Sequence, residues 1–120
     1  MKILLIDDDR FLRDMYATKF TECGDQVRVG ENGHEALSIL TDEVFDVILL
    51  DMVMPGMSGI ELMIEIRKNS TAENTKCIVL SNQGEQTDIQ AATEAGAAGY
   101  IIKAESIPSE VVTKVHSLIS

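Results

Sequence analysis

Long apolar runs and cysteine pairs are missing from this sequence, and each absence excludes a class of protein. No apolar run approaches the roughly 20 residues that a membrane-spanning helix needs. The apolar run at residues 3–6 meets three aspartates at once, so it is not a signal peptide. The two cysteines, Cys23 and Cys77, lie far apart and lack metal-ligand spacing, so we expect reduced, structural thiols. We therefore expect a cytoplasmic protein without membrane insertion.

Basic residues are also scarce. Ten lysines and arginines stand against twenty acidic residues, which gives a net charge of −10. Such a surface repels phosphate backbones, so direct binding of nucleic acid is not expected. It suits a magnesium ion or a protein with a basic patch. Hydrophobic residues make up 45% of the chain and charged residues 25%, which is typical of a globular protein. We expect one domain over residues 1–120.

Short apolar runs alternate with amphipathic stretches along the chain. Buried strands are predicted at residues 3–6, 26–29, 47–50, 77–80 and 100–102, where the runs are too short for helices. Helices are expected from residues 7–9 to Gly24, from residues 32–33, over residues 60–69, over residues 85–95 and from Pro108. This alternation predicts an α/β fold with a parallel sheet covered on both faces. Right-handed crossovers favour a doubly wound sheet with strand order 2-1-3-4-5.

Apolar residues at helical spacing indicate which side of each helix is buried. The expected stripes contain Phe11, Leu12, Met15 and Phe20; Ala36, Leu37 and Leu40; Ile60, Leu62, Met63, Ile64 and Ile66; and Val111, Val112, Val115, Leu118 and Ile119. The stretch at residues 85–95 is poor in large apolar side chains. We expect this helix to have low local stability.

Polar side chains follow four of the predicted strands at the point where each strand ends. They are Asp7, Asp8 and Asp9 after the first strand, Asp51 after the third, Ser81 at the end of the fourth and Lys103 after the fifth. In an open parallel sheet, ligands bind outside the carboxyl ends of the strands, where the strand order reverses. We therefore expect these side chains to converge on one crevice.

The grouping of acids predicts a metal and a phosphoryl acceptor. Two carboxylates about 5 Å apart repel each other by roughly 3 kcal/mol at an effective dielectric constant near 20. Mg²⁺, or Mn²⁺ in its place, offsets that repulsion and prefers oxygen ligands. An aspartate nucleophile can form an acyl phosphate. Lys103 can pair with the charge of the phosphoryl group, and Ser81 can donate a hydrogen bond to it.

The chain resembles the receiver domain of bacterial two-component response regulators, in particular the single-domain, chemotaxis-regulator type. Residues 5–9, 46–59, 78–81 and 95–103 carry the resemblance, which covers essentially the whole chain. The Met-Pro-x-Met-x-Gly sequence at residues 54–59, shortly after Asp51, is its most specific part. The resemblance implies a flavodoxin-like fold and a phosphorelay function. A sensor histidine kinase or a phosphotransfer protein would donate the phosphoryl group, and the downstream partner is left open.

The resemblance also assigns roles at the acidic end of the sheet. Asp51 is expected to be the phosphoacceptor. Asp8 and Asp51 would bind Mg²⁺ directly, together with the backbone carbonyl of Val53, while Asp7 would act mainly through water. Asp9 is either a further acid of the metal site or, as we favour, the N-cap of the first helix.

The switch roles fall on residues further along the chain. Ser81 matches a hydroxyl that moves toward the phosphoryl group, Tyr100 an aromatic ring that turns inward with it, and Lys103 the lysine that contacts the phosphoryl group. Taken without the resemblance, Ser81 and Tyr100 are also consistent with a strand-end hydroxyl and a core aromatic. The phosphorylated state would change the surface of the fourth helix, the fifth strand and the fifth helix. The residues that resemble lifetime-tuning positions are Val53, Asn82 and Gln83.

The sequence departs from the family pattern at two positions. Receivers usually have proline after the lysine, often with a cis bond, but Ala104 follows Lys103 here. A cis bond before a residue other than proline costs roughly 2.5–4 kcal/mol, so the isomer of this bond is left open. Asn82 stands where a small residue is common, and we expect an altered lifetime of the phosphorylated state.

Two other functions are compatible with parts of the pattern. A degenerate receiver would act only as a protein-interaction scaffold, and Asp51→Asn would then leave partner binding unchanged. A small Mg²⁺-dependent phosphatase of the haloacid dehalogenase kind would use Asp7 as its nucleophile, because Asp7-x-Asp9 imitates the opening motif of those enzymes. Phe11 stands where they carry threonine or valine, and 120 residues leave no room for their cap. We favour a signalling module that is not an enzyme beyond gaining and losing its own phosphoryl group.

Overall fold

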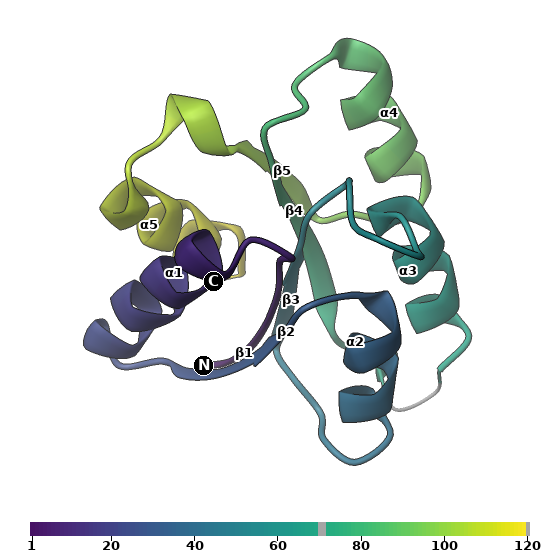
Figure 1. The fold of residues 1–120 in the computed structure, drawn as a ribbon, viewed down its shortest axis with the longest axis horizontal. Helices are drawn as coiled ribbons and strands as arrows, with labels where there is room; N and C mark the ends of the chain where they lie inside the picture. The colour runs from purple at the N-terminus through teal and green to yellow at the C-terminus, as the bar shows by residue number, and fades with distance from the viewer. Residues whose placement is uncertain (70–71, 120) are drawn as a thin grey trace.

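The computed structural model describes residues 1–69 and 72–119 and contains one five-stranded sheet (Figure 1). The strands are β1 (Lys2–Ile6), β2 (Gln26–Gly30), β3 (Val47–Leu50), β4 (Lys76–Ser81) and β5 (Gly99–Ile102). All four neighbouring pairs are parallel, and the spatial order is β2-β1-β3-β4-β5. The predicted doubly wound α/β fold and its strand order are confirmed.

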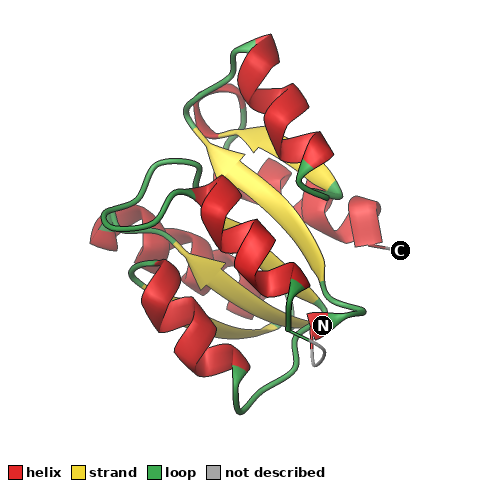
Figure 2. Ribbon diagram, turned by 90° about the vertical axis from the view of Figure 1, so that its right-hand side faces the viewer, coloured by secondary structure: helices red, strands yellow, loops and turns green. Residues whose placement is uncertain are grey.

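Helices cover both faces of the sheet, as the apolar runs of the strands require. They are α1 (Arg10–Glu22), α2 (Gly33–Leu40), α3 (Gly59–Arg67), α4 (Gln86–Glu94) and α5 (Pro108–Ile119). Helices α1 and α5 lie on one side, and α2, α3 and α4 lie on the other (Figures 1 and 2). None of the helices among the described residues is long and apolar enough to cross a membrane.

The strands are buried on both faces, which explains why their sequences show no polar alternation. In β1, Ile3 and Leu5 belong to the core under α1 and α5, whereas Leu4 and Ile6 belong to the core under α2, α3 and α4. Successive side chains of a strand point to opposite faces. A strand covered on both sides therefore needs a continuous apolar run.

Three residues that we expected in buried stripes are exposed. Phe11 is 76% exposed, Ile64 47% and Leu118 38%. The buried residues of α1 are Arg13, Tyr16 and Phe20. Phe11 precedes Phe20 by nine residues, which places the two about half a turn apart around a helix of 3.6 residues per turn. Leu118 lies at the margin of its stripe, whereas Ile64 lies about 150° around α3 from the middle of the buried residues Leu62, Met63 and Ile66.

The segment after β5 differs from the expected plain connection. A short 3-10 helix, η2 (Lys103–Glu105), follows the strand directly. The Lys103–Ala104 peptide bond is trans, which answers the question that the missing proline left open. Lys103 is buried at the start of this turn, so the side chain leaves the sheet at the same edge as the acids of β1 and β3.

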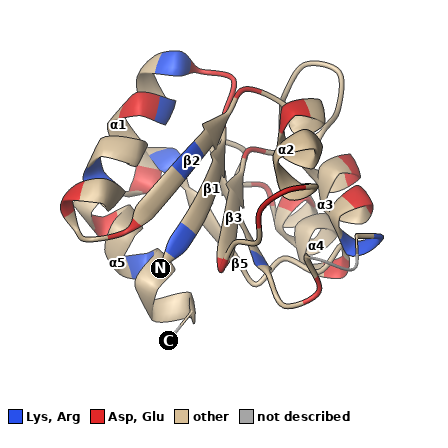
Figure 3. Cartoon of the chain, turned by 90° about the horizontal axis from the view of Figure 1, so that it is seen from below, with Lys and Arg blue, Asp and Glu red and all other residues tan. Residues whose placement is uncertain are grey.

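Acidic side chains outnumber basic ones twofold, twenty to ten. Acidic residues lie on helices on both sides of the sheet, and basic residues are fewer (Figure 3). The cluster that concerns function lies at the carboxyl edge of the sheet, where the loops after β1, β3, β4 and β5 meet.

Candidate phosphoacceptor site

The register of β1 and β3 brings two acids together. Ile6 pairs with Leu50 in the parallel ladder, so the next residues, Asp7 and Asp51, leave neighbouring strands at the same level. The backbone N–H of Asp51 still donates to the carbonyl of Ile6 at 3.3 Å. The two strands are neighbours at the point where the strand order reverses. The predicted convergence of these acids is confirmed.

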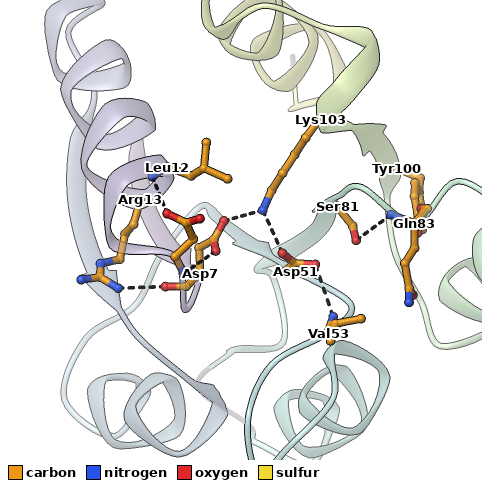
Figure 4. A network of polar contacts seen from close by, with 10 residues as sticks. Asp7, Leu12, Arg13, Asp51, Val53, Ser81, Gln83, Tyr100 and Lys103 are labelled. Atoms are coloured by element: carbon orange, nitrogen blue, oxygen red, sulfur yellow. Dashed lines mark hydrogen bonds and ion pairs between the residues drawn. The ribbon is translucent and has the colours of Figure 1, made fainter.

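Asp7 is fixed through every polar group that it carries. Its backbone N–H donates to the carbonyl of Gly30 at 3.2 Å. One carboxylate oxygen accepts from the N–H of Asp9 at 2.9 Å, and the other accepts from Lys103 Nζ at 2.6 Å. Its carbonyl accepts from Arg13 Nη1 at 2.9 Å (Figure 4). The Asp7 side chain is only 2% exposed, so these contacts hold it in one position at the buried side of the site.

Asp51 is the more accessible of the two acids. Its Oδ2 accepts from Lys103 Nζ at 2.8 Å, and its Oδ1 accepts from the backbone N–H of Val53 at 3.3 Å. Its side chain is 12% exposed, compared with 2% for Asp7. A reactant from solvent therefore reaches the carboxylate of Asp51 more easily than that of Asp7.

Helix α3 starts close beneath the backbone of Asp51. A Cβ atom on Gly59 would lie 2.3 Å from the carbonyl oxygen of Asp51, far inside van der Waals contact. The N–H of Gly59 donates to the carbonyl of Met52 at 2.9 Å. Ser58 and Glu61 close a capping box at the start of the helix. This close approach explains the glycine of the Met-Pro-x-Met-x-Gly sequence.

Lys103 neutralises the centre of the site. Its side chain is 6% exposed and bridges Asp7 and Asp51. Burial lowers the pKa of Lys103, but the hydrogen bonds and Coulombic attraction from Asp51 and Asp7 outweigh burial and raise the pKa above the ordinary lysine value. The ammonium group is therefore charged at neutral pH.

Three acids form a group that fits a hard cation. Asp7, Asp8 and Asp51 each offer a carboxylate oxygen, and these oxygens lie within 4.8 Å of one another. Asp8 is exposed and Asp7 is buried, so the group opens to solvent on one side. Oxygen donors that leave room for retained waters are what Mg²⁺ prefers. Asp9 has another role, because its side chain accepts from the N–H of Leu12 at 3.1 Å; the predicted N-cap is confirmed.

Ser81 and Tyr100 are connected through the backbone of Gln83. Ser81 is 1% exposed, and its Oγ accepts from the N–H of Gln83 at 3.2 Å. The Tyr100 hydroxyl donates to the carbonyl of Gln83. Burial, followed by the charge of Asp88, raises the pKa of Tyr100, and a hydrogen bond with Ser81 opposes the rise. Both predicted switch residues therefore hold the loop between β4 and α4.

Two contacts of this site were missed at the level of sequence. Arg13 was not singled out, although it stands at helical spacing with the buried Tyr16 and Phe20. Gln83 was expected only to resemble a lifetime-tuning position, whereas its backbone connects Ser81 and Tyr100. The spacing of Arg13 was a usable signal, but backbone contacts between loops leave no trace in residue type.

The chain is similar in sequence to known regulators. Residues 3–116 match the family described as response regulator receiver domain. The chain is 32% identical over 117 residues to the phosphate regulon transcriptional regulatory protein PhoB of Pseudomonas aeruginosa, covering 98% of this chain and 51% of PhoB. It is 38% identical over 102 residues to sporulation initiation phosphotransferase F of Bacillus subtilis, covering 85% of this chain and 81% of that protein. The transcriptional regulatory protein ResD of Bacillus subtilis is 36% identical over 118 residues, with 48% of ResD covered.

The fold is similar to that of a solved regulator. The chemotaxis response regulator CheY4 of Vibrio cholerae superposes with a TM-score of 0.91 at 27% identity, covering 98% of this chain and 97% of that one. The chain spans about half the length of the curated relatives PhoB and ResD. Because the family pattern covers nearly every described residue and the relatives share it, this chain belongs to the response regulator receiver domain family.

Proposed function

We propose that Asp51 is the phosphoacceptor of this phosphorylation switch. The observation that carries the proposal is the position of its carboxylate at the end of β3, partly open and beside two further acids and a buried ammonium group. A carboxylate oxygen of Asp51 attacks phosphorus, and the new O–P bond forms as the bond from phosphorus to the donor breaks. The donor atom leaves with the electron pair. The product is an acyl phosphate on Asp51.

The metal is proposed to bind among the acids. Asp8, Asp51 and the backbone carbonyl of Val53 would hold Mg²⁺ or Mn²⁺ directly, and Asp7 would act through water. The lower exposure of the Asp7 side chain, 2% compared with 12% for Asp51, supports this division. When bound, the dication screens the charge of the incoming phosphoryl group from the carboxylates.

Lys103 is proposed to change one of its partners from the Asp51 carboxylate to the phosphoryl group after transfer. Before transfer, its ammonium group pairs with Asp7 and Asp51. The phosphoryl group adds about −1.5 to −2 charges near neutral pH. Its charged oxygens are stronger acceptors than the remaining carbonyl oxygen of the Asp51 acyl phosphate, so Lys103 donates to the phosphoryl group and keeps its contact with Asp7.

The switch is proposed to pass through Ser81, Gln83 and Tyr100. A hydroxyl has one donor and two acceptor lone pairs, so Ser81 can donate to the phosphoryl group while it still accepts from Gln83. Movement of Ser81 then draws the loop along, and Tyr100 follows because its hydroxyl holds the other side of Gln83. Ala92 is the single buried residue of α4 among the described residues. The surface of α4 therefore shifts at low cost, and the change passes to the neighbouring surface of β5 and α5.

The phosphoryl donor is proposed to be a sensor histidine kinase or a phosphotransfer protein. Receiver domains act with such partners, and one relative carries the name sporulation initiation phosphotransferase F. The receiver unit is proposed to occupy residues 1–120, because the family match spans residues 3–116. A cytoplasmic location is also proposed.

Incubation with acetyl phosphate and Mg²⁺ tests the proposal. We expect the intact mass to rise by one phosphoryl group, and we expect no rise when a chelator removes the metal. Acetyl phosphate is suitable because transfer then needs no partner protein. An unchanged mass in the presence of Mg²⁺ would overturn the proposal.

Ser81→Ala should separate the conformational change from phosphoryl transfer to Asp51. Phosphoryl uptake is expected to persist, because Asp51, Lys103 and the acids are untouched. The amide chemical-shift changes that beryllofluoride induces in α4 and β5 should shrink to less than half of those in the parent, because the link to Gln83 is lost. NMR spectra with and without beryllofluoride measure the effect. Changes as large as in the parent would contradict the role of Ser81.

Asn82 is proposed to alter the lifetime of the acyl phosphate, with Val53 and Gln83 as further tuning positions. Asn82 and Val53 are exposed, so their side chains can affect how water approaches. We expect the hydrolysis rate of the phosphorylated form to differ between Asn82→Ala and the parent. A timed dephosphorylation assay measures both, and equal rates would refute the expectation.

A further inference from the structure

Arg13 is a buried arginine for which the phosphoryl transfer itself has no use. It lies on the inner side of α1 with Tyr16 and Phe20 and is 7% exposed. Its Nη1 donates to the carbonyl of Asp7 at 2.9 Å. Its Nη2 lies 3.7 Å from Glu31 Oε1. Its Nε has no hydrogen-bond partner within the described part of the chain.

Stability does not account for this residue. Removing a guanidinium group from water is unfavourable unless good partners surround it. The ion pair with Glu31 is long, and the Glu31 side chain is 65% exposed, so solvent screens it. The unpaired Nε adds to the cost. An apolar side chain of similar length would remove these costs and lose only the hydrogen bond to the carbonyl of Asp7.

The one strong contact of Arg13 fixes the peptide that joins two of the acids. Asp7 is already held through its side chain and its N–H. The direction of its carbonyl sets the direction in which the chain continues to Asp8. The Asp8 carboxylate receives no hydrogen bond from another described residue, so the backbone sets which rotamers of this side chain can reach Asp51. Figure 4 shows the guanidinium group of Arg13 against the carbonyl of Asp7.

We propose that Arg13 is a positioning residue of the magnesium site, which orients the Asp7–Asp8 peptide so that the Asp8 carboxylate faces Asp51. This inference rests on the proposed function, because it assumes that these acids bind Mg²⁺. Arg13 does not touch the metal or the phosphoryl group. It acts through the backbone, as groups that orient metal ligands do.

The positive charge of Arg13 and its hydrogen bond to Asp7 have opposite expected effects on Mg²⁺ affinity, and this makes the inference testable. A nearby positive charge repels Mg²⁺, so removing the charge of Arg13 would strengthen metal binding if Coulombic repulsion were its main effect. Removing the hydrogen bond to Asp7 would weaken binding if Arg13 orients Asp8. Arg13→Met removes both, and the sign of the change shows which effect is larger.

Calorimetric titration with Mg²⁺ provides the measurement. We expect the Kd of Arg13→Met for Mg²⁺ to rise roughly tenfold, the low end of the range for residues that orient metal ligands. The melting temperature in chelator is expected to stay close to that of the parent, because relief from burying the guanidinium group offsets the lost hydrogen bond to Asp7. Arg13→Lys, which keeps a donor for Asp7, should recover most of the affinity. Arg10→Met is the matched control, because Arg10 lies on the same helix with its side chain 86% exposed, and its Kd should not rise.

Each result decides the question. Unchanged or tighter Mg²⁺ binding by folded Arg13→Met would overturn the inference while leaving the proposed function intact. Unfolding of Arg13→Met would also overturn it, because Arg13 would then be a structural residue. Failure of the parent to bind Mg²⁺ would overturn the proposed function itself. Weaker binding without loss of stability, restored by Arg13→Lys, would support the positioning role.

Discussion

Replacing Asp51 with asparagine is expected to abolish phosphoryl uptake from acetyl phosphate. The amide is a poor nucleophile and cannot form the acyl phosphate. Asp7 is not expected to take over, because its side chain is only 2% exposed, compared with 12% for Asp51. Intact mass after incubation with acetyl phosphate and Mg²⁺ is expected to show the unmodified protein alone.

Asp46→Asn is the matched control for this change. Asp46 lies at the other end of the same strand, where its Oδ2 accepts from the N–H of Lys2 at 2.7 Å. The substitution makes the same change in charge, yet full phosphoryl uptake is expected. A phosphoryl group on Asp51→Asn would contradict the assignment of the acceptor. If a partner bound Asp51→Asn and the phosphorylated parent equally well, the scaffold interpretation would be favoured instead.

The architecture could be predicted because apolar runs report burial on both faces of a sheet. The run at residues 47–50 coincides with β3. Strands β1 and β4 extend beyond their apolar runs to Lys2 and Ser81, because a ladder hydrogen bond needs only the backbone. Strand ends that carry polar side chains are therefore invisible to hydropathy.

Hydropathy alone could not predict which side of α1 faces the core. Phe11 is exposed and Arg13 is buried, the reverse of what their side chains suggest. The apolar stem of an arginine can be buried along a helix while its guanidinium group reaches a polar partner. For Arg13 that partner is the carbonyl of Asp7. Such a contact depends on how the turn after β1 folds back, and residue types do not record it.

The clustering of the polar strand ends was predictable, but the contacts among them were not. Parallel strands place their carboxyl ends at one edge, so Asp7, Asp51 and Lys103 had to lie near each other. Sequence reasoning gave Lys103 to the phosphoryl group and did not foresee that it bridges both acids before phosphorylation. The link through Gln83 was also unforeseen, because it uses backbone atoms.

Replacing Lys103 with methionine is expected to lower the free energy of unfolding by about 3–5 kcal/mol in chelator at neutral pH, the usual cost of removing one partner from a buried ion pair. The change leaves the buried Asp7 and the partly exposed Asp51 as close negative charges. Urea denaturation measures the loss. Lys114→Met is the control, because Lys114 is exposed on α5, and its effect should stay within about 0.5 kcal/mol.

Two conditions should narrow the gap in stability between the parent and Lys103→Met, each for its own reason. Because the pKa of Lys103 is raised on folding, its stabilising effect is complete below the ordinary lysine pKa of about 10.4 and is lost as pH rises through the higher folded-state value. At strongly alkaline pH the parent should therefore lose the stabilisation from the Lys103 charge, whereas Lys103→Met lacks that contribution at every pH. At neutral pH, Mg²⁺ should stabilise the variant more than the parent, because the dication then compensates the acids without competition from the ammonium group. A gap that stays constant under both conditions would mean that Lys103 stabilises the fold by packing and not by its charge.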